Sequence, residues 1–94
     1  MGIIVRGHIV RKCRMLLHMK RNVLSELGTR IREKRKSRGW TQEELAAKAG
    51  IDRSYIGGVE RGERNLTFTV LCQICSALRY DVAALTKSIP ESEQ

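Results

Sequence analysis

The chain has 94 residues, and its 18 Lys and Arg against 10 Asp and Glu give a formal net charge of +8 at pH 7. This length supports one small core, so we expect one domain, and 41% hydrophobic with 30% charged residues excludes a disordered chain. Few aromatic residues and a single proline favour helices over short strands, which predicts an all-α fold.

The basic excess favours a polyanionic partner, and on charge alone a nucleic acid and an anionic membrane surface both remain open. The three cysteines, Cys13, Cys72 and Cys75, are too few for a disulfide framework. No apolar run approaches the length of a membrane span. We therefore expect a soluble, cytoplasmic protein without a membrane segment.

Residues 1–21 form a basic N-terminal extension that contains six Lys or Arg and no acid. The stretch has no helix cap, turn or clear period, so it predicts no defined structure, and two interpretations of it remain open. One reading is a basic arm, and the other is that translation starts at Met15 or Met19. The sequence leaves both open.

Residues 22–88 carry the pattern of five short helices. The first spans about 24–38 and ends before Gly39. Thr41 and Glu44 form a capping box that starts the second helix, which stops at Gly50. Asp52 caps a third helix, and two short helices joined by a glycine-containing turn are typical of a helix-turn-helix.

The third helix is expected to begin at Arg53, to bury Ile56 and Val59, and to leave Gly57 and Gly58 outside with Arg53 and Ser54. Thr67 caps a fourth helix and Asp81 a fifth. Residues 89–94 are expected to be an acidic tail.

Four segments carry a resemblance: residues 41–46 (TQEELA), 49–51 (AGI), 54–56 (SYI) and 59–62 (VERG). They resemble the Cro/phage-repressor (XRE-like) helix-turn-helix family over residues 25–86. Residues 52–56, 60–62 and 64–66 are most similar to the controller proteins of restriction-modification systems. The resemblance implies a five-helix, lambda-repressor-like DNA-binding domain.

The resemblance also implies roles on DNA. The start of the third helix reads base edges in the major groove, which assigns this role to Arg53, Ser54 and Tyr55, and Arg53 is suited to guanine. Gly57 and Gly58 stand where relatives offer side chains, which indicates close backbone approach to DNA or simple tolerance; we expect the former. The phosphate-contacting candidates are Thr41, Gln42, Arg64 and Asn65.

Arg35 and Glu60 match a structural ion pair of the family. Because one helix-turn-helix covers little DNA, we expect a homodimer on a near-palindromic operator, formed through the fourth and fifth helices. The dimer candidates are Phe68, Ile74, Val82 and Leu85, and the alternative is that some of them only close the monomer core.

The sequence shows no catalytic set, cofactor motif or metal-ligand cluster, which predicts a non-enzyme. Cys72 and Cys75 have C-x-x-C spacing, but they lie in a predicted helix without a second pair, which favours core packing over zinc or redox chemistry. We hypothesise a sequence-specific transcriptional regulator that binds double-stranded operator DNA, with contact to RNA polymerase open. An antitoxin-like interaction module and a membrane-surface protein are the alternatives.

Overall fold

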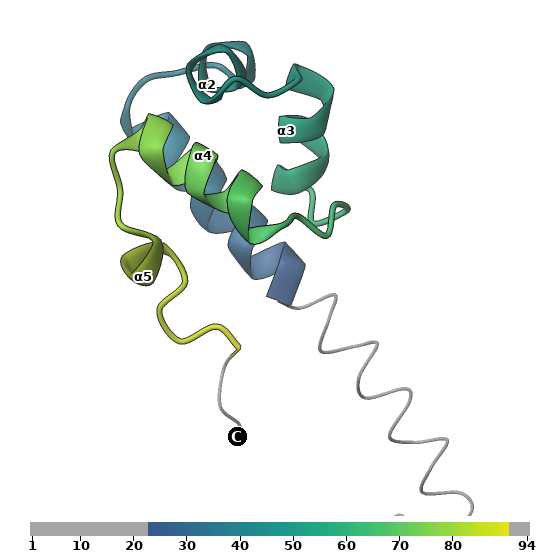
Figure 1. Ribbon diagram of the computed structural model, residues 1–94, viewed down its shortest axis with the longest axis vertical. Helices are drawn as coiled ribbons and strands as arrows, with labels where there is room; N and C mark the ends of the chain where they lie inside the picture. Colours follow the sequence, from purple (N-terminus) through teal and green to yellow (C-terminus); the bar gives the residue numbers. More distant parts are fainter. Residues whose placement is uncertain (1–22, 91–94) are drawn as a thin grey trace, which may run out of the picture.

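The computed structural model describes residues 23–90, and this part of the chain forms five helices and no strand. The predicted all-α, five-helix fold is confirmed. The expected extension of residues 1–21 and the end of the acidic tail lie outside the described residues. A helix over residues 23–37, called here the 23–37 helix, precedes four labelled helices (Figure 1): α2 (Gln42–Ala49), α3 (Arg53–Glu60), α4 (Phe68–Leu78) and α5 (Val82–Leu85).

The predicted caps start the labelled helices. Thr41, Asp52, Thr67 and Asp81 are their N-caps, and each side chain accepts a hydrogen bond from a backbone N–H in the first turn. Such a bond satisfies an N–H that has no partner within the helix. The turn between α2 and α3 begins at Gly50, whose φ of 70° suits glycine.

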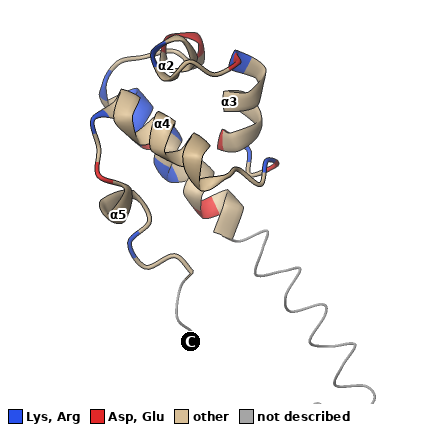
Figure 2. Ribbon diagram, in the orientation of Figure 1, with Lys and Arg blue, Asp and Glu red and all other residues tan. Residues whose placement is uncertain are grey.

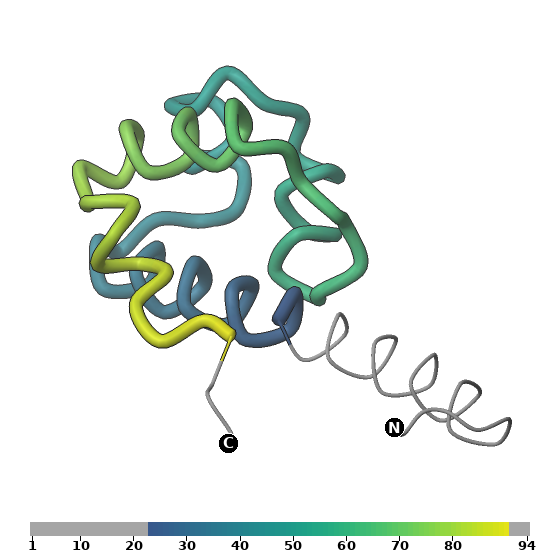
Figure 3. Tube along the Cα trace, turned by 60° about the horizontal axis from the view of Figure 1, so that its bottom comes forward, coloured from purple at the N-terminus to yellow at the C-terminus, as the bar shows by residue number. Residues whose placement is uncertain are grey.

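One hydrophobic core joins the helices. Its completely buried centre includes Ile31 from the 23–37 helix, Leu45 from α2, Ile56 from α3 and Ile74 from α4. In Figure 1, α2 and α3 lie together at one end of the domain, and Figure 3 shows α4 and the 23–37 helix on opposite sides of the trace. The helix-turn-helix thus packs on a core to which the 23–37 helix and α4 also contribute.

The 23–37 helix and α3 cross at very short range through Gly28. A Cβ atom at this position would lie 2.3 Å from the carbonyl oxygen of Val59 and 2.7 Å from that of Glu60. No real side chain fits there, because both neighbours are backbone atoms. Gly28 therefore sets the distance between the two helices.

Two arginines, Arg30 in the 23–37 helix and Arg38 directly after it, attach the C-terminal helices. Arg30 donates to the carbonyl oxygens of Leu85, at 2.9 Å, and Lys87, at 2.6 Å. Arg38 donates to the carbonyl oxygens of Leu78 and Arg79 at the end of α4. These bonds satisfy carbonyl groups that helix ends leave without an intrahelical partner.

Candidate nucleic-acid interface

Charge is unevenly distributed over the helices. The sequence of α4, FTVLCQICSAL, contains no charged residue, whereas Lys and Arg lie on the 23–37 helix, at the start of α3 and in the loop that follows α3 (Figure 2). The 23–37 helix, the start of α3 and this loop are therefore the basic parts of the fold that suit a polyanion.

The N-terminus of α2 is built by the predicted capping box. Thr41 Oγ1 accepts from the Glu44 N–H at 3.1 Å, and Glu44 Oε1 accepts from the Thr41 N–H at 2.7 Å. The box leaves the N–H groups of Gln42 and Glu43 free of these bonds, and N–H groups in a first turn favour an anion. This end of α2 is suited to a phosphate.

The N-terminus of α3 presents two of the three predicted base-reading residues to solvent. Arg53 and Ser54 are exposed, whereas Tyr55 is half-buried against the core. Asp52 accepts from the backbone N–H and the hydroxyl of Ser54. The Ser54 hydroxyl and backbone bonds hold the pKa of Asp52 below its ordinary value, so the carboxylate is charged at neutral pH.

Gly57 and Gly58 do not lie on the outside of α3, and that prediction is wrong. Both are buried, because arginine side chains from the following loop cover them. A Cβ at Gly57 would lie 3.2 Å from Arg61 Nη1, and one at Gly58 would lie 2.9 Å from Arg64 Cγ. Their lack of side chains makes room for these two arginines.

The loop after α3 carries the remaining phosphate candidates. Arg61, Arg64 and Asn65 are exposed, and the Arg64 guanidinium lies 5.0 Å from the centre of the Tyr55 ring. This stacking places Arg64 beside the face of α3. Arg61 pairs with the exposed carboxylate of Glu63 at 3.0 Å.

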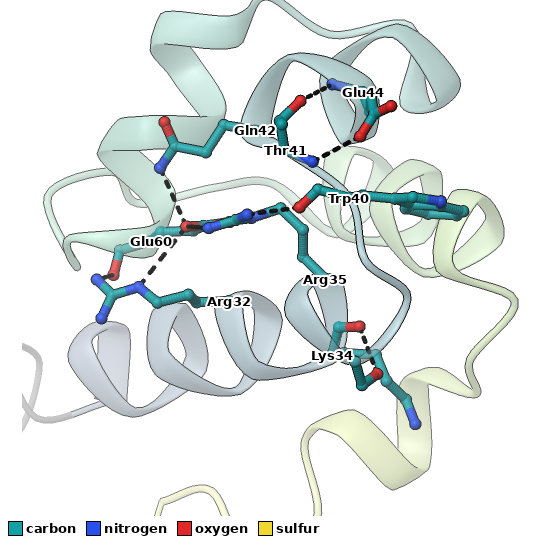
Figure 4. Close-up of polar contacts among 9 residues, drawn as sticks. Arg32, Lys34, Arg35, Trp40, Thr41, Gln42, Glu44 and Glu60 are labelled. Carbon is teal, nitrogen blue, oxygen red and sulfur yellow. Dashed lines mark hydrogen bonds and ion pairs between the residues drawn. The ribbon is translucent and has the colours of Figure 1, made fainter.

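The predicted pair of Arg35 and Glu60 is present and buried. Arg35 Nε donates to Glu60 Oε2 at 2.7 Å and Nη2 donates to Oε1 at 3.0 Å, while Nη1 donates to the Trp40 carbonyl oxygen at 2.7 Å (Figure 4). The bond to Glu60 raises the pKa of Arg35. Arg35 thus joins α3 to the segment that enters α2.

Glu60 also binds two residues that the sequence did not place beside it. Gln42 Nε2 donates to Glu60 Oε1 at 3.1 Å, and Arg32 Nε lies 3.7 Å from the same oxygen. The sequence held a signal for Arg32, because residues three positions apart share a helix face and Arg32 precedes Arg35 by three. Three side chains from the 23–37 helix and α2 therefore meet at the Glu60 carboxylate of α3.

Two of the predicted dimer residues are unavailable for a subunit contact in this fold. Ile74 and Leu85 are 0% and 1% exposed in the core, so this part of the prediction is wrong. Val82 is half-buried. Phe68, at the start of α4, is 69% exposed and is the dimer candidate that the monomer leaves most open.

The core packing expected for the cysteines of α4 holds for Cys75, which belongs to the core, and not for Cys72. Both are free thiols; Cys75 is buried and Cys72 is half-buried. Burial raises the pKa of Cys75 to about 11, so its thiol stays protonated at neutral pH. Among residues 23–90, no three His, Cys, Asp or Glu side chains are grouped as metal ligands would be.

No helix in the described part of the chain has the length and apolar character needed to cross a membrane.

The arrangement of α2, a glycine turn and α3 on a helical core defines a helix-turn-helix domain.

Comparison with known proteins places the chain in a family. The helix-turn-helix family model matches residues 31–85, more than half of the chain, and the chain belongs to this family. The resemblance drawn from residues 41–62 is thereby confirmed.

The relatives include regulators and controller proteins. The chain is 38% identical over 60 residues to a hypothetical transcription factor of Neisseria meningitidis serogroup B; the match covers 64% of this chain and 55% of the relative, about half its length. The crystal structure of the restriction-modification controller protein C.AhdI from Aeromonas hydrophila is similar with a TM-score of 0.65 and 44% identity, covering 66% of this chain and 94% of that one.

A further structure shows the tetramer of the restriction-modification controller protein C.Esp1396I in complex with its natural 35 base-pair operator. Its TM-score is 0.66 at 36% identity, and the match covers 73% of this chain and 91% of that chain.

Proposed function

We propose that this protein is a sequence-specific, DNA-binding transcriptional regulator that binds a near-palindromic operator as a homodimer, in the manner of a restriction-modification controller. The observation that carries the proposal is the geometry of the helix-turn-helix. It presents Arg53 and Ser54 at the exposed, capped start of α3, while the start of α2, which is suited to an anion, lies against the other end of α3, where Gln42 bonds to Glu60.

Each group has a role in this proposal. Arg53 enters the major groove and donates to a guanine edge, while Ser54 and Tyr55 lie beside it. Thr41, Gln42, Arg64 and Asn65 bind phosphates and fix the register of α3. The controller protein C.Esp1396I binds its operator as a tetramer, which supports an oligomer on DNA here.

We infer a dimer from the small area that one helix-turn-helix buries on DNA and from the two-fold symmetry of a near-palindromic operator. A single helix-turn-helix module buries about 600–1,000 Å² on DNA, which gives limited selectivity, so two copies on two half-sites are needed. Phe68, exposed at the start of α4, is the apolar residue that we place in the subunit interface. The relatives are regulators, which favours this function over an antitoxin-like module.

The proposal assigns no catalysis and no cofactor to the domain, because its family consists of DNA-binding regulators. It places the protein in the cytoplasm with its DNA. The proposal does not assign activation or repression, and contact with RNA polymerase applies to it only where the operator-bound dimer activates transcription.

The first test is selection of bound duplexes from random DNA with the purified protein at near-physiological salt. We expect a two-fold motif whose half-sites lie about one helical turn apart. Recovery of no motif, with binding that disappears as salt rises, would show that the basic charge only attracts polyanions.

The second test separates base reading from phosphate binding. Arg53→Ala should weaken binding to the selected operator by about 1–3 kcal/mol and relax its base preference, while Gln42→Ala should weaken all duplexes evenly. Equal losses for Arg53→Ala on selected and random duplexes would contradict the base-reading role.

A further inference from the structure

Glu60 is surrounded by more positive charge than it neutralises. Its carboxylate is 0% exposed and is held by two bonds from Arg35, whose side chain is 10% exposed. Arg32 then approaches the same group with Nε 3.7 Å from Oε1, and its side chain remains 42% exposed. One carboxylate thus faces two guanidinium groups, and Arg32 carries the uncompensated charge.

The bonds that Arg32 makes here are weak ones. Its distance to Oε1 is beyond normal hydrogen-bond range, and its Nη2 donates to the Glu60 carbonyl oxygen at 3.4 Å. Arg35 bonds the same carboxylate at 2.7 Å and 3.0 Å. Arg35 is therefore the structural partner of Glu60, and Arg32 keeps donors for a further anion.

Arg32 lies close to the residue expected to bind a phosphate. Gln42 Nε2 and Arg32 Nε both approach Glu60 Oε1, at 3.1 Å and 3.7 Å, and Figure 4 shows them on either side of this oxygen. Because both distances run to the same oxygen, the two nitrogens lie less than about 7 Å apart. Two oxygens of one phosphate, each accepting a hydrogen bond of about 2.9 Å, can reach two donors at a similar separation.

The first turn of α2 carries two carboxylates, Glu43 and Glu44, so a phosphate there needs a nearby cation. Glu43 is exposed in the first turn of α2, and its carboxylate opposes a phosphate at this end of the helix. The amide of Gln42 carries no charge to balance it, whereas the guanidinium of Arg32 does.

We propose that Arg32 binds the DNA backbone together with Gln42, at a phosphate site that spans the 23–37 helix and the start of α2. The inference rests on the proposed DNA-binding function and adds a residue to it. Glu60 positions both donors through Oε1, and Arg35 neutralises Glu60 so that its carboxylate does not repel the phosphate.

The experiment compares Arg32→Ala with Lys34→Ala. Both remove one positive charge from the 23–37 helix, but Lys34 lies on another face, with Nζ 3.9 Å from the centre of the Tyr80 ring. Binding to a labelled random-sequence duplex is measured by fluorescence anisotropy over a series of salt concentrations, because phosphate contacts do not depend on sequence.

For Arg32→Ala we expect about tenfold weaker binding. The slope of the logarithm of the association constant against the logarithm of the salt concentration should be smaller in magnitude by about 0.9 per protomer, or about 1.8 per dimer. Lys34→Ala should keep the wild-type slope, and Arg32→Lys should recover most of it. A wild-type slope for Arg32→Ala, or an equal change for Lys34→Ala, would overturn the proposal.

Thermal unfolding of the same variants separates binding from folding. We expect Arg32→Ala to keep a melting temperature near that of the wild type, because Arg35 holds Glu60 without it. If Arg32→Ala unfolds, Arg32→Gln is measured in its place, and an unchanged salt slope for it also overturns the proposal. Failure of the wild-type protein to bind any duplex would instead reject the proposed function.

Discussion

Replacement of Glu60 by glutamine tests the buried ion pair directly. Glu60→Gln keeps the shape of the side chain but removes the charge that faces Arg35, which then remains buried without a counter-charge. Breaking a buried pair from one side costs about 3–5 kcal/mol, and we expect about 3 kcal/mol because glutamine retains one oxygen acceptor. A chain of this size has a total stability of only about 5–14 kcal/mol.

The assay is urea unfolding followed by circular dichroism at a fixed protomer concentration, because dimerisation makes apparent stability depend on concentration. In a thermal melt of a domain of this size, the same loss of about 3 kcal/mol in unfolding free energy lowers the melting temperature by at least about 12 °C. The matched control is Glu63→Gln, which removes an exposed carboxylate 3.0 Å from Arg61 and should cost less than about 0.5 kcal/mol.

A loss below about 1 kcal/mol for Glu60→Gln would refute this reasoning, as would equal losses for Glu60→Gln and Glu63→Gln. The double variant Arg35→Met with Glu60→Leu gives a further check. It removes both buried charges, so it should be less destabilised than Glu60→Gln alone.

Three further predictions follow from packing and burial. Gly28→Ala should destabilise the domain by more than about 2 kcal/mol in the same urea assay, because its Cβ would meet two backbone oxygens; wild-type stability would show that the helices separate easily. Cys75 should resist alkylation at pH 8 until urea is added, as read by mass spectrometry, because burial raises its pKa to about 11; rapid modification of the folded protein would contradict its burial. Deletion of residues 1–18 should leave a folded, dimeric domain that binds the operator, and a molten or monomeric product by circular dichroism and sedimentation would show that these residues belong to the fold.

The helix boundaries were predictable because they depend on local chemistry. The capping residues Thr41, Asp52, Thr67 and Asp81 each bond to a backbone N–H two or three positions away, so the sequence contains both partners of the contact. The family resemblance supplied the pairing of Arg35 with Glu60, which spans 25 positions and has no local signal.

The errors arose where side chains from one element cover another. Gly57 and Gly58 face outward in a helical projection of α3 alone, but Arg61 and Arg64 fold back over them from the next loop. Ile74 was assigned to a dimer contact although it faces the monomer core. Periodicity identifies an apolar or open face of a helix and does not identify what packs on it.

The close crossing at Gly28 likewise could not be predicted from the sequence pattern. A glycine within a helix is unfavourable by about 1 kcal/mol relative to alanine, which signals a special requirement without naming it. The requirement is the approach of the Val59 and Glu60 carbonyl oxygens, which only the assembled fold reveals.

The covered glycines also bear on how this protein would choose its operator. Under the proposed function, the lack of side chains at Gly57 and Gly58 would concentrate direct readout by α3 in its first turn, at Arg53, Ser54 and Tyr55. Close approach of the α3 backbone to DNA requires Arg61 and Arg64 to move from their positions over the glycines. Fewer direct base contacts leave a larger share of specificity to DNA shape, so base changes between the half-sites should alter affinity where no side chain reaches them. Measured affinities that stay constant across such changes would place all of the specificity in the first turn of α3.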